Sequence, residues 1–119
     1  MAQWQDRAVT VVSAEGVPVL TNDGNYAAVA ASQTSAPLGG TGAIGDFLGT
    51  LYIIPGTSSP GAVTLKDGAT TVLAFAGGAS SVPSLLPVPI VINAYSKVGA
   101  WNVTTGANVS VLGTGNFTA

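Results

Sequence analysis

Hydrophobic and polar side chains alternate along most of the chain, in short runs separated by glycine, proline and polar residues. Such runs lie at residues 46–54, 62–66, 70–75, 88–94, 100–104 and 108–112, and two more at 7–12 and 17–20. Successive side chains of a strand point to opposite faces, so a period of two predicts strands. About eight short strands separated by turn signals predict an all-β fold, a jelly roll or β-sandwich of antiparallel strands.

Turn residues predict how some of these strands connect. Asp67-Gly68 is a tight-turn pair, so we expect residues 62–66 and 70–75 to form a hairpin. Residues 105–107 contain a glycine, and we expect them to join 100–104 and 108–112 as a second antiparallel pair. No window combines a period of 3.6 residues with helix caps. The alanine-rich segment 26–31 is therefore predicted to be a strand or part of an arm.

A length of 119 residues fits one domain. Residues 1–45 are expected to supply N-terminal strands and a flexible, extended arm, because residues 24–45 are rich in Ala, Ser, Gly and Thr. Residues 46–119 are expected to form the β-sandwich core, in one domain with the first strands.

Charged residues are unusually scarce. They make up 7% of the chain, against roughly 25% in ordinary soluble domains. A free monomer with so few charges has little electrostatic protection against association, which indicates that partners cover much of its surface. The net charge of −2 and the scattered basic residues argue against binding to nucleic acid, which needs clustered Lys or Arg.

The apolar composition does not predict a membrane protein. Pro83, Pro87 and Pro89 interrupt the most apolar run, and no stretch provides the ~20 apolar residues of a spanning helix. The first residues lack a basic region followed by an apolar one, so we expect no secretion signal and synthesis in the cytoplasm.

Candidate chemistry is weak throughout the chain. Histidine and cysteine are absent, which excludes imidazole bases, thiolate nucleophiles and ordinary zinc sites. Asp46 and Asp67 are the best carboxylate pair, but turn and strand positions explain both of them. Residues 40–45 match G-x-G-x-x-G without the preceding strand and following helix of a dinucleotide site. Residues 22–25 lack the spacing of a calcium loop. We therefore expect no enzyme, no cofactor and no metal.

Several segments carry a resemblance to a known group of proteins. They read GDFLGTLYIIP at 45–55, SPGAVTLKDG at 59–68, FAGGASSV at 75–82, GAWNVTTGANVSV at 99–111 and GNF at 115–117. Over residues 45–117 the chain resembles small β-rich proteins encoded among the structural genes of tailed bacteriophages. The resemblance implies a jelly-roll-like component of the virion, of the head decoration or cement type, and often a homotrimer.

The first functional hypothesis is accordingly a capsid decoration protein that binds the major capsid protein on the outside of a phage head and stabilises it. Trp4 and the 7–12 strand are expected on the capsid-facing or intersubunit side. The arm from Tyr26 to Leu38 is expected to lie over a neighbouring subunit, or alternatively to pack on its own domain. The candidate interface residues are Trp4, Arg7, Val9, Val11, Tyr26, Leu38 and Trp101.

Two other hypotheses use the same fold. A fibre or spike domain would bind a bacterial surface glycan through exposed Tyr, Trp and Asn side chains at one loop end. A minor tail or head-completion protein is the third. Copy number in the virion separates these hypotheses, because a decoration protein coats the head whereas a fibre tip is scarce.

Overall fold

The computed structural model describes residues 24–119, and this part of the chain contains eight strands and no helix. No helix of the described residues could therefore serve as a membrane span. The all-β prediction is confirmed. The strands predicted at 7–12 and 17–20 lie outside the described residues. The strand bounds are β1 Asn25–Val29, β2 Ala36–Pro37, β3 Phe47–Pro55, β4 Val63–Asp67, β5 Thr70–Phe75, β6 Val88–Tyr95, β7 Trp101–Thr105 and β8 Val109–Asn116.

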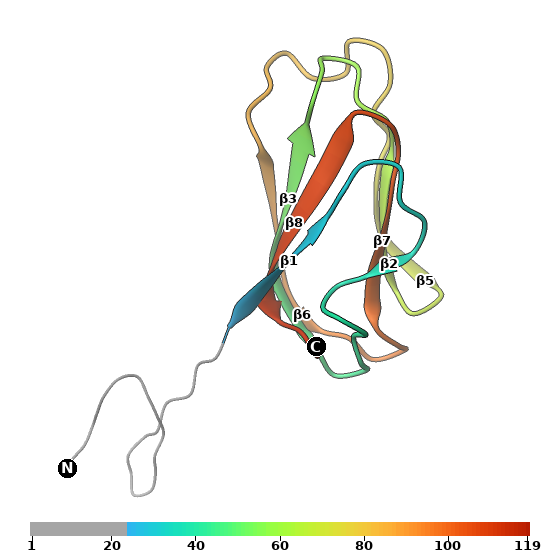
Figure 1. Cartoon of the computed structure of the whole chain (residues 1–119), viewed down its shortest axis with the longest axis vertical. Helices are drawn as coiled ribbons and strands as arrows, with labels where there is room; N and C mark the ends of the chain where they lie inside the picture. Colours follow the sequence, from blue (N-terminus) through green and yellow to red (C-terminus); the bar gives the residue numbers. More distant parts are fainter. Residues whose placement is uncertain (1–23) are drawn as a thin grey trace, which may run out of the picture.

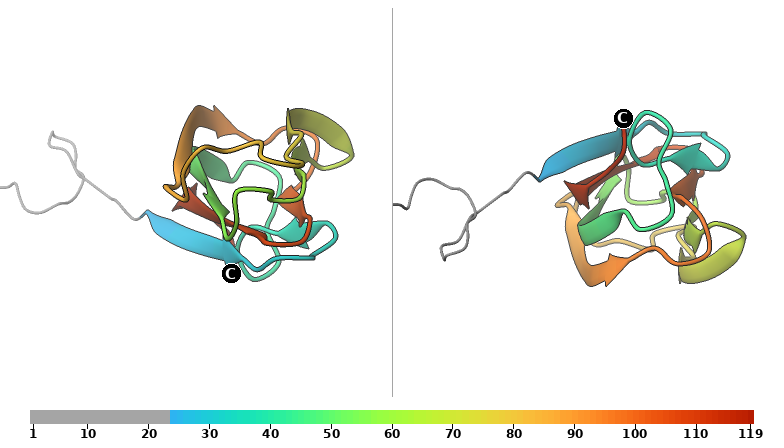
Figure 2. Two further views of the ribbon diagram at one scale, coloured as in Figure 1. Left: turned by 90° about the horizontal axis from the view of Figure 1, so that it is seen from above. Right: turned by 90° about the horizontal axis from the view of Figure 1, so that it is seen from below.

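The strands form two antiparallel sheets that pack face to face (Figures 1 and 2). Sheet A has the order β1-β8-β3-β6 and sheet B the order β2-β7-β4-β5. Strand β1 thus pairs with β8, β2 with β7, β3 with β6 and β4 with β5. This nested pairing is that of a long hairpin wound around itself, which is the arrangement of a jelly-roll sandwich.

The core lies between the two sheets and is filled by alternate residues of their strands. In β3, Leu48, Leu51 and Ile53 are fully buried, whereas the residues between them are partly exposed. The same alternation places one face of β4, β7 and β8 in the core. The buried cluster consists of Val29, Leu38, Leu48, Leu51, Ile53, Val63, Leu65, Trp101, Val103, Val109, Val111 and Phe117.

The predicted hairpin between β4 and β5 is confirmed. Gly68 has a φ of +59°, in the left-handed region that tight turns require. The predicted pairing of residues 100–104 with 108–112 is wrong. Strand β7 belongs to sheet B and β8 to sheet A, so the connection between them crosses from one sheet to the other. Gly106 donates its amide to Ala62 O at 2.8 Å, which holds this crossing against the segment before β4.

Residues 24–45 pack in the same sandwich as the rest of the described chain. Strand β1 pairs with β8 over five residues, and β2 pairs with β7. The amide of Leu38 donates to Trp101 O at 2.9 Å. Of the two placements considered for the segment from Tyr26 to Leu38, the structure therefore has the one in which it packs on its own domain.

Candidate functional site: the outer face of sheet A

The outward side of sheet A is built by the residues that alternate with the core. In β3 these are Thr50, Tyr52 and Ile54, and in β8 they are Ser110, Leu112, Thr114 and Asn116. The edge strands add Tyr26 and Ala28 from β1 and Pro89, Val91, Asn93 and Tyr95 from β6. We call this set, together with Phe47, the outer face of sheet A. It contains no charged side chain.

Register brings these side chains into rows across the sheet. Tyr52 lies opposite Leu112 on one side and Pro89 on the other, and Leu112 lies opposite Ala28. At one end of the sheet the rings of Phe47 and Tyr95 pack with their centroids 5.0 Å apart and tilted by 56°. The row through Leu112 and Tyr52 is apolar or aromatic on all four strands, whereas the next row contains the hydroxyl groups of Thr50 and Thr114.

The outer face of sheet B is polar by comparison. Asn102 lies opposite Lys66, and Thr104 lies opposite Thr64. Lys66 also faces Thr71 of β5. Outward threonine, asparagine and lysine are typical of a strand face that stays in water. The outer face of sheet A is therefore the more apolar of the two and lacks the charge that Lys66 gives to sheet B, whose edge strand has Val72 as its exposed large apolar residue.

The charged side chains of residues 24–119 are also distributed unevenly between the two outer faces. Asp46 and Asp67 are buried, while Lys66 is partly exposed on sheet B and Lys97 is exposed in the loop between β6 and β7. The described surface thus presents two lysines, one on the outer face of sheet B and one in that loop, and none on the outer face of sheet A.

Further exposed apolar side chains continue from β6 into the loop before it. Leu85, Leu86 and Val88 are exposed, Leu86 by 72%. Val91 and Tyr95 follow on the strand itself, and both are more than two-thirds exposed, at 67% and 69%. Contiguous exposed apolar residues on a soluble domain mark an interaction surface. The edge of sheet A at β6 is therefore part of the same candidate surface.

The residues that the sequence singled out lie in different places. Tyr26 is exposed on the outer face of sheet A. Leu38 and Trp101 are 0% and 2% exposed in the core of this chain, so they support its fold and do not reach a neighbour. Trp4, Arg7, Val9 and Val11 lie outside the described residues. The sequence analysis did not single out Phe47, Val91 or Leu112; apart from their place in alternating runs, nothing marks them.

The two carboxylates considered for catalysis serve the fold. Asp46 accepts hydrogen bonds from the amides of Ala43 and Thr118 and, at 2.7 Å, from the Thr118 hydroxyl. Asp67 accepts from the amides of Lys97, Val98 and Gly99 at 2.9 to 3.1 Å. Each carboxylate thereby ties a loop to the sandwich.

The hydrogen bonds to Asp67 also set its ionisation. Burial raises the pKa of this carboxyl group, but the three backbone amides and the charge of Lys97 outweigh burial and leave the pKa below its ordinary value of 3.8. A lowered pKa means that the folded state stabilises the ionised carboxylate relative to the neutral acid. The resulting stability is present above the unfolded pKa and is lost as the pH falls through the folded one.

We expect Asp67→Asn to lower the free energy of unfolding by about 2 kcal/mol at pH 7, because a neutral amide cannot replace a carboxylate that accepts three hydrogen bonds. The difference from the wild type should shrink as the pH falls below the lowered pKa, where the wild-type carboxyl is also neutral. Urea denaturation across this pH range measures it. An equal cost at neutral and acid pH would contradict the role of the ionised group.

The G-x-G-x-x-G motif considered as a dinucleotide site lacks the strand and helix that such a site requires. Residues 40–45 lie in the loop before β3, and the described chain has no helix to follow them. A Cβ at Gly40 would lie 2.6 Å from the backbone of Ala119, so the glycine permits close packing of two segments. Among residues 24–119 no group of three or more acidic, histidine or cysteine side chains could hold a metal ion.

No family model, no curated protein sequence and no solved structure matches this chain. Its function is therefore inferred from its own residues and surfaces.

Proposed function

We propose that this protein is a structural subunit of a virus particle, a capsid decoration or cement protein that binds the major capsid protein on the outside of a phage head. The observation that carries the proposal is the outer face of sheet A, which has no charged side chain and carries an apolar and partly aromatic row beside a few polar side chains. Exposed apolar patches of this kind mark interaction surfaces. The segments 45–117, which resemble phage structural proteins, supply the class of particle.

The difference in polarity between the two outer faces indicates how the subunit would be oriented on the particle. The outer face of sheet A would lie against the shell, and the outer face of sheet B, with Lys66 and its threonines, would face solvent. The exposed Leu85 and Leu86 would extend the contact beyond the edge of the sheet. The role is adhesive and requires no catalysis, cofactor or nucleic acid.

The outer face of sheet A is small, so a single subunit would bind the shell with modest affinity. Four strands about 4.8 Å apart and about seven residues long cover roughly 450 Å². At about 25 cal/mol per Å² that area gives about 11 kcal/mol before the association costs, which are themselves about 4–15 kcal/mol. Stable attachment would then come from several subunits bound together, as in a homotrimer that engages three sites at once.

A fibre or spike domain that binds a host glycan is the second candidate. The observation that favours it is the ring pair of Phe47 and Tyr95, because exposed aromatic faces are suited to stacking on sugars. Quantitative mass spectrometry of purified particles separates the two roles. A copy number that matches the capsid lattice supports decoration, and a few copies per particle support the fibre or spike.

The decisive variant is Val91→Lys, on the outer face of sheet A. We expect it to weaken binding to phage heads assembled without the protein by at least about tenfold, because the contact would bury an unpaired ammonium group. The domain should keep its stability, since Val91 is 67% exposed. Co-sedimentation with the heads measures the binding.

Ala74→Lys is the matched control. Ala74 is also exposed on an edge strand, but it belongs to the outer face of sheet B and lies opposite the uncharged Thr64. It should bind heads as the wild type does. If both lysine variants bind equally well, sheet A does not face the shell, and if neither they nor the wild type bind, the decoration role is refuted.

A further inference from the structure

Within residues 24–119, strand β1 is an edge of sheet A and pairs on one side only, with β8. Its five residues keep a continuous register from Asn25 opposite Gly115 to Val29 opposite Val111. The strand contains no proline and no charged residue. Its outer edge therefore presents a regular row of backbone amides and carbonyls.

The other three edge strands carry features that hinder pairing. Strand β6 contains Pro89 and has a register shift near Asn93, whose φ is +49°. Strand β5 has an extra residue, Val72, where its register with β4 shifts. Strand β2 has two residues, one of them Pro37. Prolines, bulges and short edges are the usual protection against edge-to-edge pairing, and among the described edges β1 alone lacks them.

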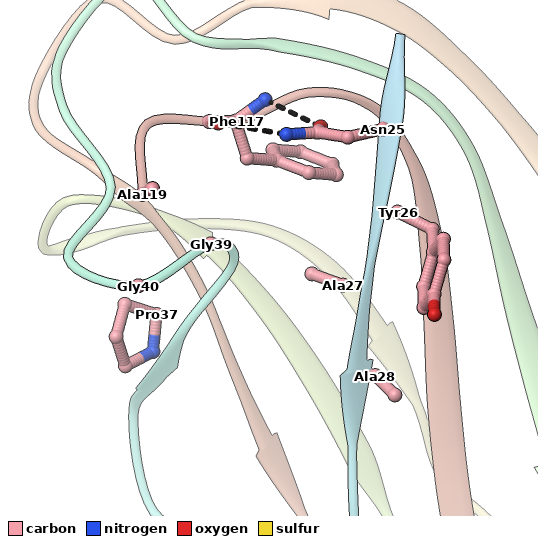
Figure 3. Close-up of a pocket in the computed structure, with 9 residues that line it drawn as sticks. All are labelled: Asn25, Tyr26, Ala27, Ala28, Pro37, Gly39, Gly40, Phe117 and Ala119. Carbon is pink, nitrogen blue, oxygen red and sulfur yellow. Dashed lines mark hydrogen bonds between the residues drawn. The ribbon is translucent and has the colours of Figure 1, made fainter.

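The edge of β1 is also accessible. An open groove of about 270 Å³ runs along it, between the strand and the segment that holds Pro37, Gly39 and Gly40 (Figure 3). The strand is held firmly at its first residue, because the Asn25 side chain donates to Phe117 O at 3.0 Å and accepts from the Phe117 amide at 2.9 Å. The edge is thus fixed in an extended form and open to a further strand.

We infer that β1 pairs antiparallel with β1 of a second copy of this chain, around a two-fold axis at Ala27. This register uses all five residues. It places Ala27 opposite Ala27 of the second copy and Tyr26 opposite Ala28 of the second copy. In Figure 3 Tyr26 and Ala28 lie on one side of the strand and Ala27 on the other.

Charge and side-chain size favour a second copy as the occupant. No charged residue occurs between positions 24 and 45, so the two-fold brings no like charges together. The large, exposed Tyr26 meets a small alanine, and the two alanines at the axis leave room for close approach. Pairing extends sheet A to eight strands and joins the two outer faces into one surface of roughly 900 Å².

This inference rests on the proposed function in one respect, since the joined outer faces of the two copies would contact the capsid shell. The pairing of the two β1 strands does not itself require the shell, so it is tested on the purified protein. It predicts a two-fold dimer, in contrast to the homotrimer that the resemblance implies. Sedimentation equilibrium of the full chain at neutral pH and micromolar concentration should show a dimer. A monomer or a trimer in that experiment would overturn the inference.

Two double variants test the register. Tyr26→Lys with Ala28→Lys places lysines opposite each other twice across the axis and should weaken the dimer by at least about tenfold. Tyr26→Lys with Ala28→Glu places lysine opposite glutamate in the same positions and should restore the dimer to within about threefold of the wild type. Both positions are exposed, so the domain should fold in each variant, as circular dichroism can verify.

Ala74→Lys with Ala76→Lys is the control, since it adds two charges to exposed positions at the end of the edge strand β5, away from Lys66. It should leave the dimer unchanged. Equal weakening by the Lys/Lys and Lys/Glu variants, or by the control, would overturn the β1 register. A wild type that dimerises but does not bind heads refutes only the proposed function, and one that binds heads but stays monomeric in solution refutes only the pairing.

Discussion

Trp101→Ala is expected to lower the free energy of unfolding by about 4 kcal/mol, as the removal of a large buried aromatic side chain does. Trp101 is 2% exposed between the two sheets, and its indole Nε1 donates to Asp46 O at 3.0 Å. Small domains are stable by only about 5–15 kcal/mol, so this loss would remove a large fraction of the total stability. Urea denaturation monitored by circular dichroism measures the effect.

Trp101→Phe is the matched control. It keeps most of the apolar volume and removes the indole donor, while the Ser96 amide still donates to Asp46 O at 2.9 Å. We expect a cost of about 1–2 kcal/mol. If Trp101→Ala costs less than about 1 kcal/mol, Trp101 does not support the core as described, and its earlier interpretation as an interface residue would regain support.

Gly115→Ala is expected to lower the free energy of unfolding by about 3 kcal/mol or more, nearly as much as Trp101→Ala. A Cβ at this position would meet the carbonyl of Phe47, with the carbonyl carbon at 3.0 Å and the oxygen closer still. Both contacts are with backbone, so relief requires β8 to move away from β3. Differential scanning calorimetry should show a markedly lower Tm.

Gly113→Ala, two residues earlier on the same strand, isolates this effect. Its Cβ would meet side-chain carbons of Leu38, Phe117 and Leu48 at 3.4 to 3.6 Å, which are ordinary contacts. We expect a change within about 1 kcal/mol in either direction. Equal destabilisation by the two alanines would mean that strand propensity, and not the close approach at Gly115, determines the cost.

Local patterns predicted most of the strands because they act over a few residues. The run at 46–54 became β3, and Asp67-Gly68 became the turn between β4 and β5. The pairing of β7 and β8 was mispredicted because sheet membership depends on contacts far away in sequence. Gly61 and Gly106 approach so closely that a Cβ on Gly61 would lie 2.8 Å from the Gly106 Cα, and this approach positions the crossing between the sheets.

The candidate surface was less predictable because large apolar side chains lie on both faces of its strands. In β3, Leu51 and Ile53 point inward while Tyr52 and Ile54 point outward, and only Thr50 on β3 marks the outward face as polar. Tyr26 was predicted as the first residue of an uncharged arm, and it is exposed on the outer face of sheet A. Leu38 is buried through tertiary contacts with β7, although the composition of its segment is typical of an arm.

The position of β8 between β1 and β3 determines when the protein can fold. Among residues 24–119, strand β1 has no partner within its own sheet until residues 109–116 have been synthesised. Such distant pairing makes folding slow and leaves unpaired edges exposed in the meantime. The complete sandwich therefore cannot form before β8 has been synthesised, and a chaperone that binds nascent chains is expected to raise the yield of the native protein.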